Sequence, residues 1–259
     1  MKPITLISFI ILTCFYLSSC KKDKLSDAGG TTLDKIVVRG TSLGGEYTYT
    51  YSYDQQNRLI SMSSMGTPGG SLIVSDVFTY DAQGKLATHT APKIFSYTFT
   101  YDANGRIIKK IGTPILANLQ VDDYSYSYDA QNRPIADTQY YAQSNAILAY
   151  NTYTYDAAGN ISEVNNFAKV GMGPFVSTGK ASFTFDNKLN PYYNLRSVLY
   201  YTNDNTFSLG RNNVSQITTA SSVSSWSFSY YSNDLPQAQT SSNTSSAQTI
   251  TTTFFFKQP

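Results

Sequence analysis

The sequence predicts an all-β protein, an antiparallel meander of repeated hairpins that forms a strongly curved sheet or barrel with little or no helix. Three observations predict this fold class. The phrase YSYDQQNRLI at residues 51–60 returns four times in related form. Aromatic and small polar side chains alternate before each copy, as in YTYTYSY at residues 47–53, which is typical of strands. No segment shows a sustained 3.6-residue period, so no helix is expected to connect the strands.

Each copy of the phrase has an aspartate at its centre. The five are Asp54, Asp81, Asp102, Asp129 and Asp156, spaced 27, 21, 27 and 27 residues apart. Such self-similarity indicates one supersecondary unit copied along the chain. Gly or Asn stands three residues after each Asp, which suits a three-residue hairpin loop. Asp favours the first position of a type I turn, and Gly or Asn tolerates the left-handed conformation that closes a bulged hairpin.

The loop type predicts which residues face each other across the hairpin. In the first copy Tyr53 faces Leu59 and Ser52 faces Ile60. The same count predicts these pairs across the five turns: Asp54 with Arg58, Asp81 with Lys85, Asp102 with Arg106, Asp129 with Arg133, and Asp156 with Asn160. We interpret these residues as structural, because each Asp stands where a turn favours it and four of the five have a basic partner.

The first nineteen residues predict a lipoprotein signal peptide, with Lys2 before a short apolar stretch. The sequence LSSC at residues 17–20 resembles a bacterial lipobox, which implies cleavage before a lipidated Cys20. Cleavage would also remove Cys14, so no disulfide is expected. Residues 20–32 are predicted to be a flexible tether and residues 33–259 a single β domain. We therefore expect a protein anchored through lipid to the outer membrane, with the cell surface favoured over the periplasm.

The repeat pattern weakens after residue 175. A longer segment at residues 187–193 replaces the tight turn, and residues 192–201 are the one stretch that could be helical or irregular. The Ser/Thr-rich residues 237–247 are predicted to form a loop, and residues 250–256 the closing strand. Whatever is specific to this protein is expected where the repeat fails, in the connectors and in residues 187–215.

Two resemblances follow from these motifs. The unit Tyr-Asp-x-x-Gly/Asn-Arg-Leu/Ile at residues 47–167 resembles the YD repeats of the RHS class, which implies a coiled β-sheet. Over residues 33–257 the chain is similar to a family of Bacteroidetes lipoproteins of unknown function with a porin-like β fold. That resemblance rests on the lipobox, the YD hairpins, NKLNPYYN at residues 187–194 and NNVS at residues 212–215. It implies architecture and location, and no activity.

The composition favours a non-catalytic binding or scaffolding module over the alternatives. The chain has 22 Tyr and 14 Phe but one Trp and one His. Tyrosine-rich surfaces suit a glycan or protein ligand, because the ring is apolar and the hydroxyl can form hydrogen bonds. The predicted ligand surface is a connector rim with Tyr192, Tyr193, Tyr200 and Tyr201. An alternative is a porin-like barrel embedded in the outer membrane, although the Ser/Thr face of the repeats would be costly against lipid.

Other function classes are not expected. His89, the single histidine, has no evident partner in the sequence, so neither an enzyme of the Ser-His-Asp type nor a zinc site is predicted. We expect no cofactor and no metal. A net charge of +2 without a large basic cluster argues against nucleic acid as a partner.

Overall fold

The computed structural model describes residues 32–40, 45–67, 72–169, 171, 173–203 and 206–257. The predicted signal peptide, Cys20 and the predicted tether up to residue 31 lie outside the described residues. Among the described residues, no helix has both the length and the apolar character needed to cross a membrane.

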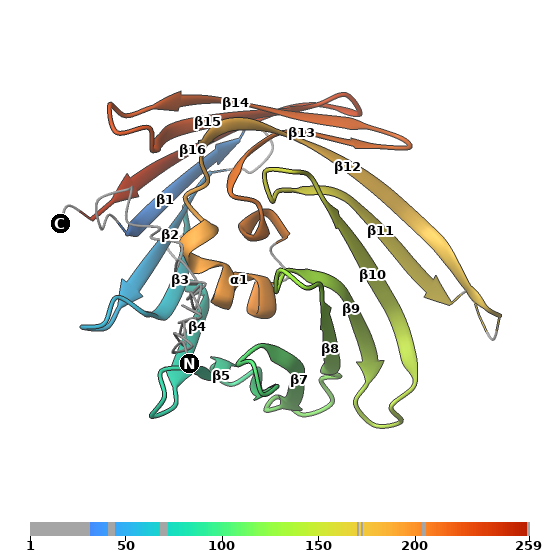
Figure 1. Ribbon diagram of the computed structural model, residues 1–259. Coiled ribbons are helices and arrows are strands. Elements are labelled where there is room, and N and C mark those ends of the chain that lie inside the picture. The colour runs from blue at the N-terminus through green and yellow to red at the C-terminus, as the bar shows by residue number, and fades with distance from the viewer. Residues whose placement is uncertain are drawn as a thin grey trace, which may run out of the picture.

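The described chain forms a closed barrel of sixteen strands, each paired antiparallel with its sequence neighbours, with β1 joined to β16 (Figure 1). The predicted all-β antiparallel meander is confirmed, and the sheet closes. The first eight strands are β1 (Leu33–Gly40), β2 (Glu46–Tyr53), β3 (Leu59–Thr67), β4 (Leu72–Tyr80), β5 (Leu86–Ala91), β6 (Phe95–Tyr101), β7 (Ile107–Pro114) and β8 (Asp122–Tyr128).

The second half of the barrel contains the only helical elements of the described residues. Its strands are β9 (Pro134–Tyr141), β10 (Ile147–Tyr155), β11 (Ile161–Lys169), β12 (Phe175–Leu189), β13 (Asn212–Thr219), β14 (Val223–Tyr230), β15 (Pro236–Asn243) and β16 (Ser246–Phe256). Three short helices lie between β12 and β13: η2 (Tyr193–Leu195), α1 (Arg196–Asn203) and η3 (Thr206–Leu209). In Figure 1 the strands surround α1.

The repeated phrase forms a hairpin with a three-residue loop. In the first copy the N–H of Asp54 donates to the carbonyl of Arg58 and the N–H of Asn57 donates to that of Asp54, each at 3.0 Å. Asn57 has φ 58°, the left-handed conformation that Gly84, Gly105 and Gly159 supply in other copies. The five turns lie at one end of the barrel, because successive strands alternate in direction. We call this end the turn end.

One detail of the predicted register is wrong. Tyr53 faces Leu59, but Ser52 faces Ser61 and not Ile60, because a bulge follows the first pair. A bulge places two residues of one strand opposite one residue of its partner. The same shift follows the Tyr–aliphatic pair in the other hairpins, whose first pairs are Tyr80 with Leu86, Tyr101 with Ile107, Tyr128 with Pro134, Tyr155 with Ile161, and Tyr230 with Pro236.

The inner face of the barrel carries the first aromatic side chain of each repeated phrase. The first residue of each repeated phrase is at most 9% exposed and belongs to the core: Tyr51, Phe78, Phe99, Tyr126 and Tyr153. The aliphatic residues that open the return strands, such as Leu59 and Ile161, belong to the same core. Alternation along the strands therefore sends the rings of the repeated phrases inward and the Ser and Thr side chains between them outward.

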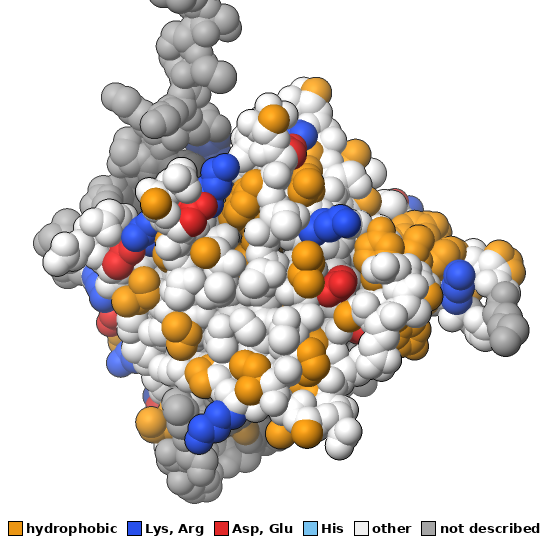
Figure 2. All heavy atoms as spheres, turned by 90° about the horizontal axis from the view of Figure 1, so that it is seen from below, with side chains coloured by type: hydrophobic (Ala, Val, Ile, Leu, Met, Phe, Trp, Pro, Cys, Tyr) orange, Lys and Arg blue, Asp and Glu red, His pale blue; other side chains and the backbone are white. Residues whose placement is uncertain are grey.

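Hydroxyl groups pair across strands on the outer face. The side-chain oxygens lie 2.6–3.1 Å apart in four such pairs: Thr79 with Thr88, Thr90 with Ser96, Thr154 with Ser162, and Thr184 with Ser215. Figure 2 shows one side of the molecule on which the backbone and side chains that are neither hydrophobic nor charged cover most of the surface, and hydrophobic side chains form separate groups. The outer face thus has no continuous apolar covering on this side.

The prediction of a loop at residues 237–247 is wrong. Residues 236–243 form β15, which pairs with β14 on one side and β16 on the other. A Ser/Thr-rich strand is stable here because both neighbours complete its backbone hydrogen bonds. The stretch predicted as helical or irregular, residues 192–201, falls on η2 and α1.

Candidate functional site

The repeat fails between β12 and β13 because a long segment is inserted into a turn. The N–H of Asn190 donates to the carbonyl of Arg211 at 2.9 Å, the same bond that Asp54 makes to Arg58. We call residues 190–203 and 206–211 the lumen segment. The Asn190 side chain joins its two ends, because its Nδ2 donates to the carbonyls of Phe207 at 2.6 Å and Gly210 at 2.8 Å.

Apolar packing draws the lumen segment into the barrel. Leu195, Val198, Leu199 and Leu209 are each at most 8% exposed and share one core with the inward-facing side chains of the wall. Burial of a Leu or Val side chain stabilises a fold by about 1.5–3 kcal/mol. The segment therefore fills part of the lumen and divides the remaining space.

The four tyrosines predicted to form an exposed rim lie on this segment, and Tyr200 corrects that prediction. Tyr200 is 2% exposed, with its ring centroid 5.8 Å from that of Tyr126. The hydroxyl oxygen of Tyr201 lies 2.7 Å from that of Tyr128 on the wall. Tyr192 packs against Phe254 with ring centroids 6.2 Å apart, and Tyr193 lies under the guanidinium of Arg196 at 4.0 Å. Tyr192, Tyr200 and Tyr201 pack against the core inside the barrel because the segment folds inward.

The tyrosine before each aspartate links its hairpin to the preceding one. The Tyr101 hydroxyl donates to the carbonyl of Leu86 at 2.7 Å, and the same bond recurs in the other copies at 2.5–2.7 Å. The basic residue of one hairpin also lies over the tyrosine ring of the next. These cation–ring pairs are Arg58 with Tyr80, Lys85 with Tyr101, Arg106 with Tyr128, and Arg133 with Tyr155. Sequence reasoning missed these links, although the spacing of the basic residues is the signal that could have revealed them.

The turn aspartates are occupied with local bonds. The carboxylate of Asp102 accepts from the N–H groups of Asn104 and Arg106 and from the Arg106 guanidinium. The hydrogen bond from the Arg106 backbone N–H lowers the pKa of Asp102, and the Arg106 guanidinium lowers it further. Partial desolvation acts in the opposite direction but does not cancel these effects. Asp54 pairs with Arg58 and Asp129 with Arg133 in the same way. At Asp81 the N–H of Lys85 donates to the carboxylate, and at Asp156 the N–H of Asn160 does so.

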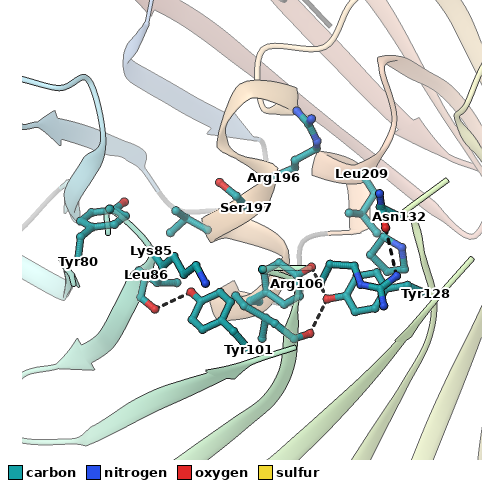
Figure 3. A pocket seen from close by; sticks show the side chains of 16 residues that line it. Tyr80, Lys85, Leu86, Tyr101, Arg106, Tyr128, Asn132, Arg196, Ser197 and Leu209 are labelled. Carbon is teal, nitrogen blue, oxygen red and sulfur yellow. Dashed lines mark hydrogen bonds between the residues drawn. The ribbon is translucent and has the colours of Figure 1, made fainter. Parts of the chain in front are cut away.

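A cavity of about 320 Å³ lies at the turn end between the wall and α1 (Figure 3). We call it the turn-end chamber. Its lining is Tyr80, Gly84, Lys85, Leu86, Tyr101, Gly105, Arg106, Ile107, Tyr128, Asn132, Pro134, Arg196, Ser197, Val198, Tyr201 and Leu209. The volume is at the lower end of the range of about 300–1,000 Å³ typical of small-molecule sites.

The chamber is lined by three cations. Arg106 is paired with Asp102, its Nη2 lying 2.6 Å from Oδ2. Lys85 and Arg196 have no carboxylate partner among the described residues; the Lys85 Nζ lies 4.9 Å from the centroid of the Tyr101 ring, and Arg196 donates to the carbonyl of Tyr193 at 2.8 Å. Burial raises the pKa of Tyr201 to about 12, so that hydroxyl adds no negative charge at neutral pH. The chamber thus combines two unpaired positive charges with neutral rings.

His89 lies apart from this chamber. It is 1% exposed, and its Nε2 lies 2.7 Å from Oδ1 of Asp76, a partner that the sequence did not reveal. Its ring stacks with Phe78 at 5.1 Å and with Tyr97 at 5.9 Å. No group of three or more metal-ligating side chains occurs within the described ranges.

Comparisons with known proteins identify the fold. No protein-family model matches the chain, and no curated protein matches it. A crystal structure of a porin-like protein from Bacteroides uniformis matches 87% of this chain and 98% of its own length, with 13% identity and a TM-score of 0.61. A porin-like protein from Bacteroides vulgatus matches 88% of this chain and all of its own length, with 12% identity and a TM-score of 0.59. The chain has a porin-like barrel fold.

At these identities the likeness shows the fold alone. It supports the porin-like barrel, which the sequence placed second, better than the general binding module that the sequence placed first.

Proposed function

We propose that the chain is a lipid-anchored envelope protein whose porin-like barrel binds an anionic saccharide in the turn-end chamber without catalysis. The observation that carries this proposal is the convergence of Lys85 and Arg196. They come from a wall turn and from α1, and neither has a carboxylate partner among the described residues. An anionic ligand would supply the missing partner through charge-assisted hydrogen bonds.

The other lining groups suit a saccharide. Ser197 and Asn132 are both exposed. The amide oxygen of Asn132 accepts a hydrogen bond from Arg106 at 3.1 Å, so its amide N–H groups remain as donors for a ligand. Tyr80, Tyr101 and Tyr128 contribute ring surface, while the hydroxyl of each donates to a backbone carbonyl. A concave cavity of this volume fits a small ligand better than the surface of a protein partner.

The absence of catalysis is part of the proposal. His89, the single histidine, is 1% exposed and does not line the chamber. The turn aspartates 54, 102 and 129 are held as carboxylates by backbone N–H groups and arginines. A general acid needs a pKa near the operating pH, and these carboxyl groups have theirs lowered.

A second candidate is a porin-like barrel embedded in the outer membrane, which the shared fold favours. A lipid-facing barrel carries an apolar band with aromatic girdles on its outer face. Here paired hydroxyls such as Thr79 with Thr88 lie on the outer face, and the first ring of each repeated phrase points inward. We therefore favour a barrel that faces water and is held at the membrane through Cys20.

The ligand proposal predicts that two charge-removing variants weaken binding of an acidic oligosaccharide. Lys85→Met keeps the aliphatic stem beside Tyr101 and removes the charge, and Arg196→Gln keeps a donor for the carbonyl of Tyr193. Hydrogen bonds to charged groups contribute about 1.5–3 kcal/mol, so each variant should weaken binding about tenfold to hundredfold. Isothermal titration with trigalacturonate measures the effect, and rising salt should weaken wild-type binding.

Lys109→Met is the matched control, because Lys109 is exposed and does not line the turn-end chamber. It removes the same charge from the molecule and should leave the affinity unchanged. Equal affinities of wild type and both chamber variants, with circular dichroism showing all of them folded, would refute an anion site at Lys85 and Arg196.

A further inference from the structure

A second cavity of about 370 Å³ lies on the other side of the lumen segment, against the inner faces of β14, β15 and β16. It shares no lining residue with the turn-end chamber. Trp226, Phe228, Phe207 and Tyr192 supply its aromatic surface, and Gln239 and Ser241 supply polar groups. We call it the tryptophan chamber.

The strand register sorts these side chains into two adjacent rows. Trp226 on β14 faces Ser241 on β15, and Phe228 faces Gln239. The Phe207 ring, carried by η3, lies 6.0 Å from that of Trp226 at 70°, and Phe207 is 36% exposed. A row of ring faces therefore lies beside a row of amide and hydroxyl groups.

The polar groups of this chamber are available for a ligand. Neither the indole N–H of Trp226 nor the side-chain amide of Gln239 has a hydrogen-bond partner among the described residues. The hydroxyl of Ser241 makes one long bond of 3.4 Å to the carbonyl of Ile250. No charged side chain lines the cavity. These features exclude an anion as the preferred ligand, because a buried charge needs a partner.

We propose that the tryptophan chamber binds an uncharged saccharide unit, as a second site independent of the anion site. A sugar ring has an apolar C–H face and hydroxyls at its edge. The C–H face would stack on Trp226 or Phe228, and the hydroxyls would bond to the Gln239 amide and the indole N–H. A purely apolar ligand would leave both donors unpaired, which costs free energy.

Trp226 is the only tryptophan in the chain, so its fluorescence reports on this chamber alone. The full-length protein is titrated with a panel of neutral disaccharides: cellobiose, maltose, xylobiose, mannobiose and galactobiose. We expect at least one to shift the emission saturably at millimolar concentration or below. Lys85→Met and Arg196→Gln should leave that response unchanged, which separates this site from the anion site.

Gln239→Leu tests the polar row, because it keeps the size of the side chain and removes the amide. It should weaken the responding disaccharide about fivefold or more, while Gln237→Leu, at an exposed position of the same strand, should not. No saturable response to any panel member would overturn the proposal. Binding that Gln239→Leu leaves unchanged or strengthens, or tighter binding of cyclohexanol than of every disaccharide, would overturn it in favour of an apolar ligand.

Discussion

Leu199→Ala is expected to lower the free energy of unfolding by about 2–5 kcal/mol, because it leaves a void between α1 and the barrel wall. Leu199 is 2% exposed and belongs to the core that joins the lumen segment to the inward-facing side chains. Single domains are stable by only about 5–15 kcal/mol, so this loss would be a large fraction of the total. Urea denaturation of wild type and variant measures the difference.

Leu116→Ala is the matched control, since Leu116 is 55% exposed. Surface substitutions usually change stability by less than about 0.5 kcal/mol. If Leu199→Ala behaved like Leu116→Ala, the lumen segment would not be packed inside the barrel, and the division of the lumen into two chambers would fail.

Raising the pH above 10 is expected to unfold the barrel together with the ionisation of its tyrosines. The tyrosines that precede the turn aspartates, among them Tyr53, Tyr101 and Tyr128, donate their hydroxyl protons to backbone carbonyls. Burial is the largest cause that raises the pKa of each above the usual value of 10. For Tyr201 burial raises the pKa to about 12. An ionised hydroxyl cannot donate, so each ionisation removes a link between hairpins.

The sign of the effect follows from the raised pKa values. The folded state holds the tyrosine proton more tightly than the unfolded state, so this contribution is fully present below pH 10. It is lost as the pH rises from 10 towards the folded pKa. Each unit of difference corresponds to about 1.4 kcal/mol, and several tyrosines act together.

Absorbance at 295 nm and circular dichroism, followed along one alkaline titration, check this expectation. Tyrosine ionisation should be delayed and should coincide with unfolding, whereas protein in denaturant should titrate smoothly near 10. Smooth titration of the folded protein near 10, with no loss of structure, would contradict the role of these tyrosines in linking the hairpins.

The hairpins could be predicted because their determinants are local. Period-two alternation predicts the strands. Asp54 and Asn57 predict the three-residue loop, and the loop type predicts the pairing of Tyr53 with Leu59 that the structure shows. The bulge beyond that pair was missed, because nothing in the spacing marks Ile60 as the extra residue. The strand at residues 236–243 was missed because Ser, Thr and Gln occupy both of its faces, so its hydrophobic alternation is weak.

The site could be predicted only in its position along the chain. The break in the repeat at residues 187–215 indicated where the specific features lie. The contacts that build the chambers join residues far apart in sequence, such as Tyr128 with Tyr201, and no local pattern encodes them. Tyr200 was predicted to lie on the rim, but it is buried. Its burial results from the inward folding of α1, which depends on the apolar face of the helix and on the size of the lumen.

The most direct test of a water-facing barrel anchored by lipid is the distribution of wild type and Cys20→Ser between membrane and soluble fractions, in lysates made without detergent. We expect wild type to sediment with membranes and Cys20→Ser to be released as a folded, monodisperse protein. A Cys20→Ser protein that stays in the membrane and requires detergent for extraction would contradict it, and would show that the barrel itself is embedded.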